Sequence, residues 1–165
     1  HMIRQEIAYS SNRLQRPIVY GILRDDMMIA LERTEVLAGH AIIVPDGRTV
    51  PWTTASGKVI VAFMAEDEQE QLLAAQPEEL QVSLRKELAE IRKSGYCEYT
   101  NESGGVGIAA PLFGESGLPV ACLILFSQTA GHNEPQSREA RESLIALAGR
   151  CSSYLGYADR LLPML

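Results

Sequence analysis

Short apolar runs bounded by turn residues predict β-strands in the first third of the chain. Residues 18–23 and 27–32 are two such runs, and residues 24–26 (Arg-Asp-Asp) separate them, which predicts a hairpin. A third apolar run, residues 41–44, is followed by Pro45-Asp46-Gly47. Proline fixes φ and glycine permits positive φ, so this tripeptide predicts a turn.

The clearest hairpin signal comes later in the chain. Residues 101–107 (Asn-Glu-Ser-Gly-Gly-Val-Gly) are rich in glycine and lead into the apolar run 108–113. Residues 114–117 (Gly-Glu-Ser-Gly) then predict a turn, and a second apolar run follows at 120–126. Two apolar runs around a glycine-containing turn predict a β-hairpin.

Helical spacing marks both ends of the chain. Ile3, Ile7 and Leu14 share one face of a predicted helix that ends before Pro17. The predicted C-terminal helix has Pro135 in its first turn, a position that proline favours. Its apolar stripe consists of Leu144, Leu147, Ala148, Cys151 and Leu155.

Two further helices are predicted in the middle of the chain. Residues 69–75 follow Glu66 and Asp67, whose negative charges suit a helix N-terminus. A longer helix is expected to begin at Ser83, a suitable N-cap, and to end at Gly95.

Residues 53–64 are ambiguous. Val59-Ile60-Val61 would suit a buried strand, whereas Ser56-Gly57-Lys58 could begin a buried helix. With about five strands, short hairpin connections and helices at both ends and in the middle, the chain is predicted to be an α+β domain with a mainly antiparallel sheet. We expect helices on one sheet face, and loops, a partner or a ligand on the other.

The amino-acid composition of the chain excludes several classes of protein. The 165 residues are 46% hydrophobic, and their formal net charge is −6. This composition predicts one folded domain and excludes intrinsic disorder. The longest apolar runs, 59–65 and 120–126, are far shorter than the ~20 residues of a membrane span. An acidic chain with three lysines also lacks the basic face of a module that binds nucleic acid unaided.

Cysteine and histidine placement offers little for catalysis. The three cysteines have no C-x-x-C spacing, so we expect reduced thiols, a cytoplasmic location, and core positions for Cys122 and Cys151. Cys97 is the one cysteine near a predicted loop. His40 and His132 have no metal-ligand spacing, so neither a metal nor a cofactor is expected.

Four motifs together resemble a known family. They are residues 50–63 (VPWTTASGKVIVAF), Glu66 with its helix, residues 91–96 (IRKSGY) and residues 101–113 (NESGGVGIAAPLF). In this order they resemble the effector-binding domain of IclR-family bacterial transcriptional regulators, over residues 18–156. The resemblance implies a GAF-like or profilin-like fold and favours a helix at 59–64.

The resemblance also implies a domain organisation. Residues 2–165 would form the effector-binding domain, and a winged helix-turn-helix absent from this sequence would precede it and bind DNA. His1, which stands before Met2, would be a residue left by cloning. Family members commonly assemble as homodimers or homotetramers, so we expect a small-molecule effector, a second copy of the chain, and no membrane as partners.

Motif matching also assigns an effector site. Backbone N–H groups at Ala55 and Ser56 would face an anionic ligand. Asn101 and Glu102 match a polar loop, and Gly107 matches the small residue before Ala-Ala-Pro. The apolar or altered positions of the site are Ile42, Val50, Trp52, Ile124 and Phe126.

Departures from the family pattern indicate the kind of effector. Ile124 and Phe126 stand where some members that recognise small acids have serines, and Trp52 begins a stretch that replaces the usual histidine. Fewer hydroxyl groups and more apolar area favour an effector less polar than a two- or three-carbon acid, such as an aromatic carboxylate. Alternatively, the Phe126 side chain fills the pocket and little binds there.

The family resemblance leads us to predict a sensing domain and no enzyme. The alternatives are a thiol reductase that uses Cys97 and an oligomerisation module.

Overall fold

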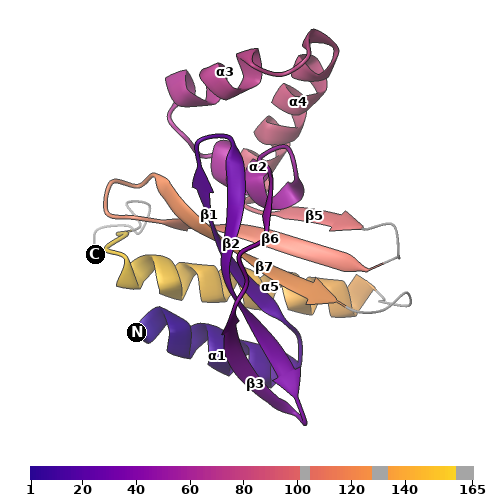
Figure 1. Cartoon of the computed structure of the whole chain (residues 1–165), viewed down its shortest axis with the longest axis vertical. Helices are drawn as coiled ribbons and strands as arrows, with labels where there is room; N and C mark the ends of the chain where they lie inside the picture. Colours follow the sequence, from indigo (N-terminus) through magenta and orange to yellow (C-terminus); the bar gives the residue numbers. More distant parts are fainter. Residues whose placement is uncertain (101–104, 128–133, 159–165) are drawn as a thin grey trace.

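One antiparallel sheet forms the centre of the computed structural model (Figure 1). The structure describes residues 1–100, 105–127 and 134–158, with only the backbone of 134–136. In the sheet the strands follow the order β3-β2-β1-β7-β6-β5, and β4 also pairs with β2. The strands are β1 (Ile18–Arg24), β2 (Met27–Leu37), β3 (His40–Pro45), β4 (Thr49–Pro51), β5 (Cys97–Thr100), β6 (Val106–Phe113) and β7 (Pro119–Ser127).

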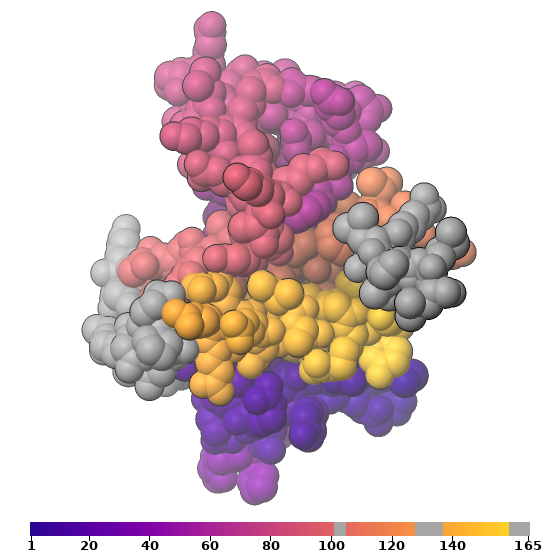
Figure 2. Space-filling view, turned by 180° about the vertical axis from the view of Figure 1, so that it is seen from behind, coloured from indigo at the N-terminus to yellow at the C-terminus, as the bar shows by residue number. Residues whose placement is uncertain are grey.

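Helices contact both faces of this sheet. Two of them, α1 and α5, pack on one face, and Figure 2 shows α5 crossing that face next to α1. On the opposite face α2 contacts β5, β6 and β7, while α3 and α4 pack beyond α2 (Figure 1). The helices are α1 (Met2–Leu14), α2 (Ala55–Val61), α3 (Glu66–Ala74), α4 (Glu78–Ser94) and α5 (Glu134–Tyr154).

Strand alternation divides the buried side chains into two cores. Ile18, Ile108 and Leu125 pack with α1 and α5, whereas Val19 and Ile124 pack with α2. Successive strand residues point to opposite faces, so an almost continuous apolar run supplies both cores at once. This arrangement explains why the two apolar runs of the β6–β7 hairpin show no alternation with polar residues.

The predicted α+β class and both predicted hairpins are confirmed. So are the N-terminal helix, the end of α4 at Gly95, and the helical alternative for residues 53–64, which contain α2. The expected N-cap at Ser83 is wrong, because α4 begins five residues earlier at Glu78 and the Ser83 hydroxyl donates to the Leu80 carbonyl.

Two short strands were not predicted, since Thr49–Pro51 and Cys97–Thr100 are only three and four residues long. The second sheet face also differs from the expectation, because α2 covers part of it. Among the described residues, no helix is long and apolar enough to cross a membrane.

The Pro45-Asp46-Gly47 segment does not reverse the chain. Pro45 pairs with Glu32 and Thr49 pairs with Ile29, so β3 and β4 run along the same edge of β2. Three residues, Asp46 to Arg48, lie opposite two on β2, which makes the segment a β-bulge. Gly47 adopts a φ of 85°, as the turn prediction required.

The C-terminal end of α1 is tied to the sheet by a buried polar cluster. The Ser11 and Thr34 hydroxyl oxygens are 2.6 Å apart, and the Ile18 backbone N–H donates to Thr34 Oγ1 at 2.8 Å. Ser11 also donates to the Arg16 carbonyl at 2.5 Å. These bonds satisfy polar groups that burial would otherwise leave without partners.

Helix α2 lies unusually close to the residues that precede it. A Cβ on Gly57 would stand 2.2 Å from the Trp52 carbonyl oxygen and 2.4 Å from the Trp52 Cα. These are backbone atoms that cannot move aside as a side chain can, so only glycine allows this approach. Trp52, with 1% of its surface exposed, then packs in the core beside Val59.

We predict that Gly57→Ala lowers the free energy of unfolding by about 2 kcal/mol or more, because the added methyl overlaps the Trp52 backbone. Gly149→Ala is the matched control: Gly149 lies in α5, and its Cβ would meet no atom within 4 Å. That variant should be neutral or more stable by up to about 1 kcal/mol. Urea unfolding followed by circular dichroism measures both, and equal effects would contradict the prediction.

Candidate functional site

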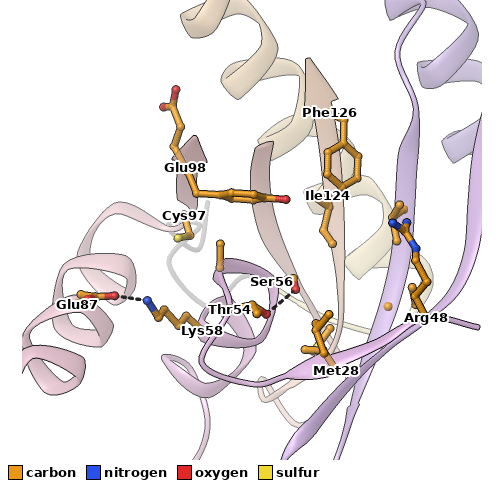
Figure 3. Close-up of a pocket in the computed structure, with 16 residues that line it drawn as sticks. Met28, Arg48, Thr54, Ser56, Lys58, Glu87, Cys97, Glu98, Ile124 and Phe126 are labelled. Carbon is orange, nitrogen blue, oxygen red and sulfur yellow. Dashed lines mark hydrogen bonds and ion pairs between the residues drawn. The ribbon is translucent and has the colours of Figure 1, made fainter. Parts of the chain in front are cut away.

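A cavity of about 550 Å³ lies between the N-terminal end of α2 and the sheet (Figure 3). Its volume is in the range of small-molecule sites. The bulge and β4 form one side, β5 forms another, and β1, β2 and β7 contribute the wall opposite α2. The lining residues are Val19, Gly21, Met28, Ala30, Arg48, Val50, Thr54, Ala55, Ser56, Lys58, Glu87, Cys97, Glu98, Tyr99, Ile124 and Phe126.

The walls of the cavity are mainly apolar. Val19, Met28 and Ile124 belong to the α2-side core, and Phe126 is half-buried against it. Ile124 and Phe126 are two residues apart on β7, so both side chains face the same side of the sheet (Figure 3). The cavity remains open beside Phe126, so this side chain does not fill it.

Tyr99 is positioned by the glycine opposite it. Tyr99 of β5 pairs with Gly107 of β6, and a Cβ on Gly107 would stand 2.4 Å from the Tyr99 ring. The ring therefore lies over the Gly107 backbone, and any residue with a Cβ at position 107 would overlap the ring. Burial raises the pKa of Tyr99, so its hydroxyl stays protonated and can donate a hydrogen bond to a ligand.

The bulge brings a cation to one side of the cavity. Arg48 Nε donates to Asp46 Oδ1 at 2.8 Å, and Arg48 Nη2 donates to Asp46 Oδ2 at 2.7 Å. The hydrogen bonds from Arg48 lower the pKa of Asp46, so the carboxylate stays charged.

A second ion pair lies on the other side in Figure 3, where Lys58 Nζ donates to Glu87 Oε2. Glu98 points away from the cavity centre and faces Arg141 of α5 at 3.5 Å. Polar groups between the two sides are few. The Thr54 and Ser56 hydroxyl oxygens are 3.3 Å apart at the start of α2.

The chain also matches proteins of known class. Residues 6–153 match the family described as "Bacterial transcriptional regulator IclR C-terminal". The chain belongs to this family. The curated HTH-type transcriptional regulator KdgR of Escherichia coli (strain K12) is 26% identical over 160 residues, which are 90% of this chain and 61% of KdgR. The chain thus spans about three fifths of the length of this relative.

Solved structures of domains from transcriptional regulators share the fold. The C-terminal domain of E. coli KdgR superposes with a TM-score of 0.77 at 24% identity, over 94% of this chain and 96% of that domain. The inducer-binding domain of a double mutant of the transcription factor PobR from Acinetobacter, in a complex with 3-hydroxybenzoic acid, gives a TM-score of 0.74 at 18% identity, over 92% of this chain and 95% of that domain. The expected GAF-like or profilin-like fold is therefore confirmed.

The IclR motifs place half of the expected site residues around one cavity. Val50, Ala55, Ser56, Ile124 and Phe126 all line it. Gly107 does not line the cavity itself but lies under the Tyr99 ring, which does.

The other expected site residues lie elsewhere. Trp52 is in the core beneath α2, and Ile42 is 43% exposed on the edge strand β3, beyond the bulge. Asn101 and Glu102 lie outside the described residues.

Several lining residues were not among those expected. Tyr99 and Arg48 reach the cavity through a short strand and a bulge that the sequence pattern did not reveal. A usable signal existed for Arg48, because it is a lone basic residue directly after the Pro45-Asp46-Gly47 turn signal and two residues before Val50. Lys58 belongs to the Ser56-Gly57-Lys58 motif, which predicted the start of a helix but no contact with the cavity.

The thiols do not have the environment of a reactive cysteine. Burial raises the pKa of Cys122 to about 12 and that of Cys151 to about 11, and both are fully buried. Burial also raises the pKa of Cys97, which lines the cavity. A nucleophilic cysteine needs a lowered pKa, so this environment favours protonated thiols. Within the described residues, no three His, Cys, Asp or Glu side chains form a group that could hold a metal.

We predict that the buried thiols make the protein less stable in alkali. Their folded pKa values exceed that of about 8.5 for an unfolded thiol, so above about pH 9 the unfolded chain loses protons that the folded chain keeps. The free energy of unfolding should then fall as pH rises from about 9 to 11. Each fully buried thiol contributes up to about 1.4 kcal/mol per pH unit.

Cys122→Ala should reduce this slope, measured by urea unfolding at a series of pH values. At pH 7 both states hold neutral thiols, so the difference there reports packing alone. Parallel curves for the two proteins from pH 7 to 11 would contradict the prediction.

Proposed function

We propose that this domain binds a small organic acid with an apolar body, such as an aromatic carboxylate, in the cavity beside α2. The observation that carries the proposal is the make-up of that cavity: apolar side chains from β1, β2, β4 and β7 line it, and a cation lies at its margin. The apolar walls favour burial of a ring, at roughly 25 cal/mol per Å² of apolar area. The Arg48 guanidinium offsets the cost of bringing a carboxylate out of water.

The shape of the walls favours a ring over a very small acid. Ile124, Phe126 and Met28 present no hydroxyl or amide group to a polar ligand. Because the cavity has a volume of about 550 Å³, an acid of two or three carbons would leave most of it without ligand contacts. The similar domain of the PobR double mutant forms a complex with 3-hydroxybenzoic acid, which has this combination of a ring and a carboxylate. That relative supports the proposal as a precedent within the same fold.

Regulation of DNA binding is the second part of the proposal. KdgR is a helix-turn-helix regulator, and this chain matches only part of its length. We propose that this domain acts with such a DNA-binding segment and in a homodimer or homotetramer. Effector binding would shift the population between two arrangements of the subunits.

We predict that aromatic carboxylates raise the midpoint of thermal unfolding of this domain. A ligand at 100 times its Kd should stabilise the domain by about 2.7 kcal/mol. The panel is benzoate, 3-hydroxybenzoate, 4-hydroxybenzoate, pyruvate and acetate, measured by differential scanning fluorimetry. Benzoates should shift the midpoint more than the two small acids.

Phe126→Ser tests whether this cavity is the site, because it removes apolar wall area and adds a hydroxyl. The variant should lose most of the benzoate shift. Val120→Ser is the matched control, since Val120 is on the same strand, is 47% exposed and does not line the cavity. If no member of the panel shifts the folded protein, the domain is better explained as an oligomerisation module.

We also predict that the domain confers ligand response on a DNA-binding segment. This chain would replace the matching three fifths of KdgR, and operator occupancy would be measured by fluorescence anisotropy with and without the benzoate that binds best. Occupancy should change at the ligand concentration that shifts thermal stability. Carrying Phe126→Ser in the chimaera should remove the response, and an identical response in that variant would contradict this part of the proposal.

A further inference from the structure

We propose that Arg48 is the group that holds the ligand carboxylate, and that the Lys58–Glu87 pair on the opposite side receives a neutral hydroxyl. The cavity would then select aromatic acids with a hydroxyl at the far end of the ring. This inference rests on the function proposed above and adds to it the orientation of the ligand and the residue that selects an acid. Its basis is the difference between the two ion pairs that border the cavity.

The Arg48 backbone is held firmly at the cavity edge. The Ala30 N–H donates to the Arg48 carbonyl at 2.8 Å, and the Gly47 N–H donates to the Ala30 carbonyl at 2.8 Å. Ala30 itself lines the cavity. The bulge therefore fixes the point from which the Arg48 side chain extends, which favours a preorganised contact.

In the Arg48–Asp46 pair, the cation is the accessible partner. The Arg48 side chain is 64% exposed, whereas the Asp46 side chain is fully covered. The Asp46 carboxylate accepts from Nε and from one hydrogen of Nη2 of Arg48. No acceptor for Nη1 of Arg48 is found in the part of the chain that the structure describes. Nη1 and the second Nη2 hydrogen can therefore donate to a carboxylate at the cavity margin.

The Lys58–Glu87 pair has the opposite character. The Lys58 side chain is only 18% exposed, and Glu87 already compensates its charge. A ligand carboxylate placed there would face Glu87 and would have to displace it from a largely buried ammonium, which is costly. A hydroxyl can instead accept from the ammonium and donate to the Glu87 carboxylate, so it fits without breaking the pair.

The two pairs are separated by a mainly apolar space, in which the polar groups are few. Figure 3 shows Arg48 on one side and Lys58 with Glu87 on the other, and Ile124 lies between them. A ligand that reaches both needs a polar group at each end of an apolar body. A ring with a carboxylate and a distant hydroxyl meets this requirement, whereas a plain benzoate satisfies only one end.

The test compares acids with their neutral amides. Kd values are measured by isothermal titration calorimetry for benzoate, 3-hydroxybenzoate, 4-hydroxybenzoate and the three corresponding benzamides. Arg48→Gln should weaken the acids about ten- to hundredfold, because it removes a charge-assisted hydrogen bond. The same variant should change the Kd of the amides by less than about twofold, since no charge is involved.

Asp46→Asn provides a test by gain of affinity. The substitution keeps Oδ1 as an acceptor for the Arg48 backbone N–H and Nε. It removes the negative charge that competes with the ligand, and it replaces the Oδ2 acceptor of Nη2 with an amide NH2, which frees Nη2 for the ligand. The acids should bind several-fold more tightly, and the amides should not change. Arg33→Gln is the matched control, because Arg33 faces Asp46 at 3.7 Å but does not line the cavity.

Lys58→Met tests the far end of the ligand. The better of the two hydroxybenzoates should bind the unaltered protein more tightly than benzoate, and Lys58→Met should abolish that difference. A retained preference in the variant would overturn the assignment of the hydroxyl to this pair.

The possible failures are distinguishable. If the unaltered protein binds the acids but Arg48→Gln binds them equally well, the assignment of Arg48 is wrong and the proposed function stands. If Asp46→Asn changes the Kd of the acids by the same factor with Arg48 and with Gln at position 48, its effect does not pass through this guanidinium, and the assignment is again overturned. If none of the six compounds binds the unaltered protein, the proposed function fails and this inference fails with it.

Discussion

The approach of α2 to the Trp52 backbone is the constraint on which the site depends. Gly57 lets the helix lie against that carbonyl, and the helix position in turn places Ala55 and Ser56 at one side of the cavity. A residue with a Cβ would push α2 outward, because the opposing atoms belong to the main chain. Core packing and site geometry are therefore set by the same contact, and neither can change alone.

More of the fold than of the site could be predicted from the sequence. The β6–β7 hairpin and the end of α4 at Gly95 follow from apolar runs and turn residues, which act locally. The choice of a helix at α2 came from the family resemblance, since a segment of seven residues, five of them buried, suits a helix or a strand equally well. The predicted start of α4 was wrong because Pro77 is the N-cap residue and the helix begins at Glu78, so that Ser83 lies inside the helix.

The site was less predictable because non-local pairing creates it. Tyr99 reaches the cavity only because β5 pairs with β6 and Gly107 leaves room for its ring. Arg48 reaches it only because one extra residue interrupts the edge strand. In contrast, Trp52 and Ile42 show that an apolar residue near a motif can equally be core or surface, because hydrophobicity alone does not distinguish a cavity wall from either.

Strand β2 contributes to both faces of the sheet through an irregularity in its pairing with β1. Tyr20 pairs with Glu32 and Gly21 pairs with Ala30, so Leu31 is an extra residue that reverses the alternation of β2. Near its start, Met28 and Ala30 line the cavity on the α2 side. Near its far end, Thr34 holds the last turn of α1 on the opposite face through Ser11. A displacement of β2 along its own length would therefore move the α1 anchor directly, because one strand with no intervening loop joins the cavity to Thr34.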